Sequence, residues 1–270
     1  MKTNKIYTFL LLLVVMVMVC MTLFSPIPNN IKLIIRILLL TAFFISWRIF
    51  HKKNLTNAKD IAFTLMALIL AFLIVSPFTS EFWNLKTETS KGFAFSKLSD
   101  AVIISLVLII SFIVAGYKLK SIYLTKGRLI HGLIIGILFF ILFGFLALNN
   151  PQERPEPNFL RKSYLWILVF VFANGFMEEL IFRGIFLEKL NHYFKPIWSI
   201  ILTSICFAAP HLTVNYKPDT LAFAGIVFVL GMICGYAMHY TKSIIAPMLI
   251  HAGADLMIIL PVFVSYGVIN

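Results

Sequence analysis

Charged residues are scarce in this 270-residue chain, and hydrophobic residues take their place. Asp, Glu, Lys and Arg together make up 13% of the sequence, whereas 60% is hydrophobic and Phe alone occurs 27 times. Soluble domains usually contain about 25% charged and roughly 45–50% apolar residues. A soluble fold of this composition would expose large apolar patches, which soluble monomers rarely do. The composition therefore excludes an ordinary soluble domain and favours a membrane protein.

Acidic residues and cysteines are also few. The shortage of acids leaves a formal net charge of +12, and the basic residues lie in short clusters between apolar runs. That distribution is typical of membrane topology, so we expect no nucleic acid partner. Cys20, Cys206 and Cys234 lie inside apolar runs and form no CxxC pair. This pattern argues against a disulfide framework or a cysteine metal site.

Long apolar runs are what the sequence has in abundance. A spanning helix needs about 20 predominantly apolar residues, and a helix satisfies all its backbone groups within its own segment. Uninterrupted runs do not match the alternating strands of a membrane barrel. The sequence therefore predicts an all-α, polytopic membrane helix bundle with eight or nine transmembrane helices, because one run is short. The predicted spans are residues 6–25, 33–50, 61–79, 101–117, 129–148, 164–187, 197–211, 221–240 and 243–264.

Basic residues between the runs predict which helix ends face the cytoplasm. Clusters at residues 48–59, 118–128 and 189–195 follow the second, fourth and sixth runs. Under the positive-inside rule these loops would be cytoplasmic, so the N-terminus is also predicted to be cytoplasmic. Residues 149–158 contain three prolines and are the clearest linker, and would lie on the opposite side.

Three charges lie inside the predicted helix at residues 164–187, namely Glu178, Glu179 and Arg183. Each ionised residue at mid-helix costs about 2.5–3.5 kcal/mol on insertion scales, so the segment inserts only marginally unless its charges are accommodated. Glu179 and Arg183 are i and i+4 and can pair on one face. Glu178 is rotated by about 100° and needs a partner elsewhere in the bundle. Intramembrane ionisable residues are by default a functional hypothesis, and a packing network is the alternative.

Two further polar features occur in later apolar runs. His211 ends the predicted span at residues 197–211, where a lone histidine is more often interfacial than a ligand. His251 and Asp255 are i and i+4, so the carboxylate could orient the imidazole or both could bind one group. Gly253 and Ala254, between them in the sequence, would allow close helix approach. With the two glutamates, these residues suggest one polar cavity in which a carboxylate activates water and histidines or a metal stabilise an oxyanion.

These motifs, in this order, resemble a known family. Residues 178–183 read EExxxR, residues 207–211 read FxxxH, and residues 251–255 read HxxxD, where the family has HxxxN or HxxxD. On successive apolar helices they resemble the CPBP family of CAAX-prenyl-endopeptidase-type and bacteriocin-processing or immunity proteins, also called Abi. The resemblance covers about residues 164–257. It divides the chain into residues 1–160, transmembrane helices of unassigned role, and residues 161–265, an intramembrane protease core.

The resemblance implies an intramembrane endopeptidase that hydrolyses a peptide bond in a membrane-associated peptide or protein. Glu178 and His211 would activate the attacking water. His251 and Asp255 would stabilise the oxyanion or bind a metal. A carboxylate donates a hydrogen bond only when protonated, so an ionised Asp255 would orient His251 or bind the metal instead.

The resemblance also implies supporting residues and leaves the cofactor open. Glu179 and Arg183 would support the site. Zinc or another divalent metal is one alternative, since Glu178, His211 and His251 could supply three ligands and leave one position open. A metal-free glutamate mechanism is the other alternative, and the chain contains no HExxH motif.

Two functions other than proteolysis are also open. A bacteriocin-immunity or scaffold protein would keep the pocket for binding alone, and a proton-coupled transporter would use buried Glu and His as a relay. The transporter alternative lacks inverted repeats and matched pairs of broken helices. The expected partners are membrane lipids and a peptide or protein substrate that the sequence does not name. The resemblance implies a bacterial plasma membrane.

The topology can be tested by cysteine labelling. With the three native cysteines replaced by serine, a cysteine introduced within residues 149–158 is expected to react with an impermeant thiol reagent added outside the cell. A protease added outside should not remove a tag at Met1. Labelling of the loop from the cytoplasmic side alone would contradict the predicted orientation.

Overall fold

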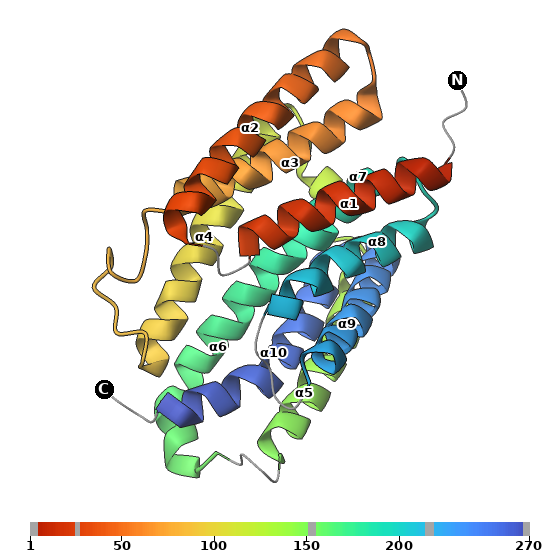
Figure 1. The fold of residues 1–270 in the computed structure, drawn as a ribbon. Coiled ribbons are helices and arrows are strands. Elements are labelled where there is room, and N and C mark those ends of the chain that lie inside the picture. The colour runs from red at the N-terminus through yellow and green to blue at the C-terminus, as the bar shows by residue number, and fades with distance from the viewer. Residues whose placement is uncertain (1–4, 25–27, 151–154, 214–218, 267–270) are drawn as a thin grey trace.

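The computed structural model describes residues 5–24, 28–150, 155–213 and 219–266. Within these residues all regular structure is helical and no strand occurs, which confirms the predicted all-α fold (Figure 1). Nine helices of the described chain are long and apolar enough to cross a membrane. The protein is therefore a multi-pass helix bundle, and its orientation in the membrane stays a prediction.

The helices follow one another with short connections. The α-helices are α1 (Lys5–Phe24), α2 (Asn29–Lys52), α3 (Thr56–Val75), α4 (Ser90–Val114), α5 (Leu129–Leu148), α6 (Pro157–Glu179), α7 (Leu187–Leu190), α8 (Pro196–Ala208), α9 (Thr220–Thr241) and α10 (Ile245–Tyr266). Two 3₁₀ segments, η1 (Leu119–Ile122) and η3 (Ala209–Thr213), and one π-helix, η2 (Leu180–Phe186), complete the set. The π-helix joins α6 to α7 in a single span, and η3 extends α8 to the length of a span.

Helix α4 begins at Ser90, earlier than the predicted start at residue 101. The side chain of Thr89 caps the helix by accepting a hydrogen bond from a backbone N–H of the first turn. The ammonium of Lys91 lies 5.6 Å from the ring centroid of Trp166, so its stem runs along apolar surface while its charge stays outside. The predicted start of α4 was wrong because an apolar run was taken as the whole helix. The first turns of a helix can also contain polar residues, which such a run leaves out.

Helix α6 also begins earlier than predicted, at Pro157 rather than at residue 164. Proline is favoured in the first helical turn because its missing N–H would have no partner there. The proline-rich linker predicted at residues 149–158 therefore ends inside this helix. Residues 151–154 of that linker lie outside the described residues.

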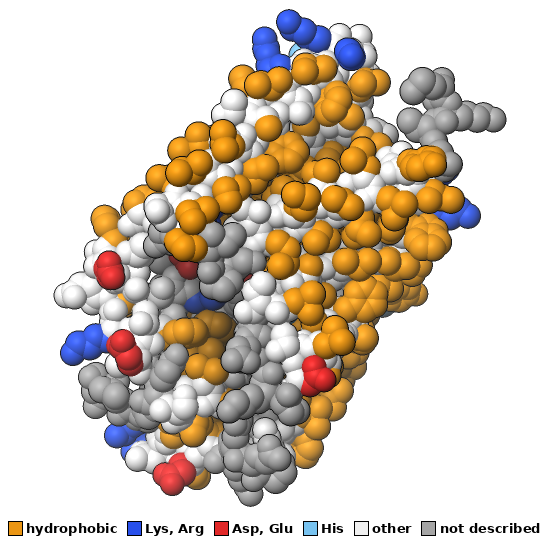
Figure 2. Space-filling model, viewed as in Figure 1, with side chains coloured by type: hydrophobic (Ala, Val, Ile, Leu, Met, Phe, Trp, Pro, Cys, Tyr) orange, Lys and Arg blue, Asp and Glu red, His pale blue; other side chains and the backbone are white. Residues whose placement is uncertain are grey.

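The helices surround the segment that carries the charged motifs. Helices α2 and α3 form an antiparallel pair at one end of the molecule (Figure 1). Helix α6 packs against both α4 and α10, α10 packs along α5, and α8 packs on α9. Hydrophobic side chains cover much of the face seen in Figure 2, while Lys and Arg gather at the tip of the α2–α3 pair. Such a surface is typical of helices that face lipid.

Glycines bring α10 close to its neighbours. A Cβ at Gly253 would lie 2.8 Å from the Cα of Phe140 on α5, and a Cβ at Gly175 of α6 would lie 3.1 Å from the backbone of α10. The prediction that Gly253 allows close helix approach is confirmed. Gly253 is two residues from both His251 and Asp255, about 200° around the helix, so α5 packs against the face of α10 opposite these side chains.

Gly253→Ala is expected to lower the unfolding temperature of the purified protein in detergent. The added methyl group would meet the backbone of α5, and overpacking costs typically about 1–3 kcal/mol. The matched control is Gly225→Ala on α9, where an added Cβ meets nothing within 4 Å. That variant should melt at the parent temperature or slightly above it. Equal melting temperatures for the two variants would contradict the close approach.

Candidate active site

Glu179 and Arg183 form a buried ion pair within one span. Nη1 of Arg183 lies 2.8 Å from Oε1 of Glu179, and both side chains are 0% exposed. The i, i+4 pair predicted from the sequence is therefore present. Glu179 ends α6 and Arg183 lies in the π-helix η2. Short π-helical segments are rare and occur frequently at functional sites.

The guanidinium of Arg183 packs between α8 and α9. Its Cζ lies 4.4 Å from the ring centroid of Phe207 on α8, close enough for a cation–π interaction. A Cβ at Gly231 of α9 would lie 2.9 Å from Nη2, so glycine leaves the space that the guanidinium occupies. Nε and Nη2 have no hydrogen-bond partner among the described residues. Arg183 thus joins η2 to α8 and α9.

Glu179 also binds the imidazole of His251 on α10. The oxygen that accepts from Arg183, Oε1, lies 2.8 Å from Nδ1 of His251. With the carboxylate ionised, Nδ1 carries the proton and donates it, an assignment made from the contact itself. One carboxylate oxygen therefore connects the arginine of η2 with the histidine of α10. This contact fixes the imidazole and leaves Nε2 for other groups.

Two further carboxylates lie near Nε2 of His251. Oδ1 of Asp255 is 3.5 Å away and Oε2 of Glu178 is 3.7 Å away. Both distances exceed the range of about 2.7–3.2 Å for a direct N–H···O hydrogen bond. Glu178, which had no local partner in the sequence, therefore faces His251. Its side chain is 14% exposed, whereas that of Glu179 is fully buried.

Asn174 belongs to this site and was missed by the sequence reasoning. Its Nδ2 donates a hydrogen bond of 2.9 Å to Oδ2 of Asp255, and the side chain is buried. Asn174 lies one turn before Glu178 on α6, at i and i+4 on the same face. The sequence did contain a signal for Asn174: it is an isolated amide within an apolar run, and it lies on the same helical face as the intramembrane Glu178.

His211 lies beside this network rather than in it. Its Nδ1 is 2.9 Å from the carbonyl oxygen of Phe207, one turn earlier in the chain, so the backbone orients the ring. The Phe207 ring centroid is 5.3 Å from that of His211 and 5.4 Å from that of His251. Among the described residues no hydrogen bond or ion pair joins His211 to Glu178. The structure brings Glu178 together with His251 instead.

The residues named for a metal do not form a ligand set in this arrangement. Across the described part of the chain, no group of three His, Cys, Asp or Glu side chains could hold a metal ion. Glu178 and His251 lie near one another, whereas His211 contacts Phe207 and the ring of Phe223. Metal dependence stays a prediction, and no step of the reaction proposed below passes through a metal.

Comparison with known proteins identifies the segment that carries this network. Residues 160–257 match the family described as type II CAAX prenyl endopeptidase Rce1-like. No curated protein and no solved structure matched the chain. The match covers the three motifs and also Asn174. This segment is an Rce1-like domain of the CPBP or Abi family, which confirms the resemblance noted in the sequence, and the domain boundary at residues 160 and 161 stays a prediction.

Arg183→Ala is expected to lower both protein yield and thermal stability. The change would leave the carboxylate of Glu179 buried without its cation, a loss of about 3–5 kcal/mol in buried pairs. The double change Glu179→Gln with Arg183→Gln should recover part of this stability, because neither charge of the pair stays buried. Thermal unfolding in detergent measures both effects.

The matched control for Arg183→Ala is Lys52→Ala, which removes an exposed cation from the last turn of α2. That variant should melt at the parent temperature. An Arg183→Ala protein as stable as the parent but inactive would show that Arg183 serves the substrate and not the fold.

Proposed function

We propose that this chain is an intramembrane endopeptidase that hydrolyses a peptide bond in a membrane-associated peptide or protein, with Glu178 as general base. The observation that carries the proposal is the difference between two adjacent glutamates. Glu179 is fully buried and bound by Arg183 and His251. Glu178 is partly exposed and faces Nε2 of His251. The Rce1-like family of residues 160–257 supports the class of reaction.

The gap between Glu178 and His251 suits the attacking water. At 3.7 Å the two side chains are too far apart for a direct hydrogen bond. One water molecule can hydrogen-bond to both Oε2 and Nε2 at about 2.8 Å each. Glu178 would accept a proton from this water as its oxygen attacks the scissile carbonyl carbon. Glu178 would then return the proton to the amine that leaves when the C–N bond breaks.

His251 would stabilise the negative charge that develops on the tetrahedral intermediate. Its Nδ1–H is held by Glu179, whose charge is balanced by Arg183. In its protonated form the ring would donate from Nε2 to the developing oxyanion. A donor held in place before the reaction needs no reorganisation in the transition state, which is why such groups are effective.

Asp255 would act through His251. One of its oxygens accepts from the amide of Asn174, and the other lies 3.5 Å from Nε2 of His251. An ionised carboxylate in this position stabilises a positive charge on the imidazole. We therefore assign Asp255 to orient and support His251, with Asn174 as its hydrogen-bond donor. His211 would help Glu178 to activate the water, a role that the family resemblance supports.

Glu178→Gln is expected to abolish processing and leave the melting temperature unchanged. Glutamine keeps the shape of the side chain but cannot take a proton, and losing a general base reduces the rate by typically about 10²–10⁴-fold. The measurement is comparative peptidomics of membranes from cells with the parent gene, the variant or no gene. Glu88→Gln, at an exposed carboxylate, is the matched control and should process normally.

Two results would contradict the proposal. A Glu178→Gln protein that processes peptides at more than about a tenth of the parent rate would remove Glu178 from the mechanism. Identical peptides with and without the gene would argue against proteolysis and favour a binding role, such as immunity.

A further inference from the structure

Arg36 of α2 is a buried cation without an anionic partner. Only 8% of the residue is exposed. Nη1 donates 2.9 Å hydrogen bonds to the carbonyl oxygen of Phe72 and the hydroxyl of Ser76, and Nη2 lies 3.4 Å from the carbonyl oxygen of Leu23. All three acceptors are neutral, and Nε has no partner within the described residues. Buried charges in proteins are normally paired, so we expect this guanidinium to bind an anion from outside the chain.

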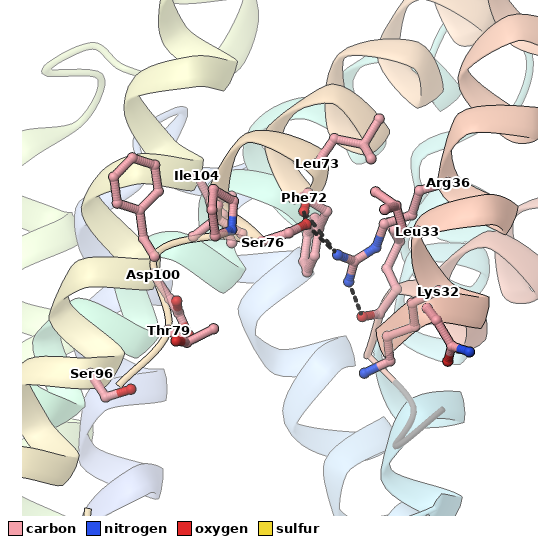
Figure 3. Close-up of a pocket in the computed structure, with 15 residues that line it drawn as sticks. Lys32, Leu33, Arg36, Phe72, Leu73, Ser76, Thr79, Ser96, Asp100 and Ile104 are labelled. Atoms are coloured by element: carbon pink, nitrogen blue, oxygen red, sulfur yellow. Dashed lines mark hydrogen bonds between the residues drawn. The ribbon is translucent and has the colours of Figure 1, made fainter. Parts of the chain in front are cut away.

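Arg36 lines a cavity of about 690 Å³ formed by α2, α3 and α4. Figure 3 shows Lys32 and Arg36 entering from α2 on one side, and Ser96 and Asp100 from α4 on the other. Ser76, directly after α3, lies between the two walls and accepts from Arg36. The volume falls in the range of about 300–1,000 Å³ typical of ligand pockets.

Charge is divided between the two walls of this cavity. Lys32 and Arg36 are i and i+4, so they lie on one face of α2, and Lys32 lies in its first turn, where the helix dipole is also positive. Asp100 lines the cavity from α4. No carboxylate of the described residues, Asp100 included, lies within ion-pair distance of either cation. The cavity therefore presents two positive charges and one negative charge, separated from one another.

The position of the cavity favours an amphiphilic ligand. It lies where α2 begins and α3 ends, at one end of two membrane-spanning helices, which is the level of lipid headgroups. Leu33, Leu73 and Ile104 border the same space. A free anion would satisfy the cations alone, whereas a phospholipid also covers the apolar part. Basic pockets between spanning helices are suited to lipid headgroups.

We propose that this cavity binds the headgroup of a zwitterionic phospholipid. The phosphate would accept hydrogen bonds from the guanidinium of Arg36 and from Nζ of Lys32, the charge-assisted contacts that these groups make with phosphate. The ammonium of the headgroup would lie toward the carboxylate of Asp100. The site is separate from Glu178 and His251, and the proposal holds whether or not the chain is a protease.

The test is native mass spectrometry of the full-length protein in detergent, titrated with phosphatidylethanolamine, phosphatidylglycerol or inorganic phosphate. The parent is expected to retain one phosphatidylethanolamine molecule in preference to phosphatidylglycerol. Lys32→Gln should weaken this binding by about tenfold, as expected for the loss of one charge-assisted contact. Arg48→Gln, an exposed cation on the same helix, is the control and should bind as the parent does.

Asp100→Asn tests the second half of the site. Removing the carboxylate should shift the preference from phosphatidylethanolamine toward phosphatidylglycerol, since only the first headgroup carries an ammonium. Arg36→Gln should abolish retention of either lipid. If that variant does not fold, Lys32→Gln and Asp100→Asn test the proposal on their own, because neither side chain makes a hydrogen bond to another described residue.

Three outcomes would overturn the proposal. In the first, Lys32→Gln binds phosphatidylethanolamine as tightly as the parent. In the second, Arg48→Gln loses binding to the same extent as Lys32→Gln, which would indicate only general attraction of lipid by a basic protein. Inorganic phosphate could displace the lipid at equal concentration, which would make the site one for a soluble anion.

Discussion

The carboxylate of Glu179 is the group on which the rest of the site depends. A charge in an apolar bundle is tolerated only when it is paired, and Glu179 is paired twice, with Arg183 and with His251. These contacts hold the π-helical segment against α10. Glu178 directly precedes Glu179 in the chain, so fixing Glu179 also fixes the direction of the Glu178 side chain. That side chain points toward Nε2 of His251. One structural carboxylate thereby positions the adjacent carboxylate for chemistry.

Close helix packing makes this arrangement fit inside the bundle. Gly231 leaves room on α9 for the guanidinium of Arg183, and Gly253 lets α10 approach α5 between His251 and Asp255. In lipid, helices gain little from burying apolar side chains, so close contact and polar pairing supply most of the association. The glycines that pack the helices therefore lie beside the residues that form the site, either in space, as Gly231 does, or in the sequence, as Gly253 does.

The sequence predicted features that depend on one helix at a time. Hydropathy found every span, and i, i+4 spacing found the pair of Glu179 with Arg183. What it missed depends on how helices lie against each other. Nothing in spacing says that Glu178 meets His251 rather than His211, or that Asn174 reaches Asp255 across the interface.

The most direct test of the site is a pair of double-mutant cycles on thermal stability. One cycle combines Glu179→Gln with His251→Gln, and the other combines Glu178→Gln with His251→Gln. A buried contact to a charged group contributes about 1.5–3 kcal/mol, so the first cycle should show coupling of that size. The second should show a smaller coupling, because Oε2 of Glu178 and Nε2 of His251 lie 3.7 Å apart, beyond direct hydrogen-bond distance. Coupling that is equal in the two cycles, or larger for Glu178, would contradict the division between a structural and a reacting glutamate.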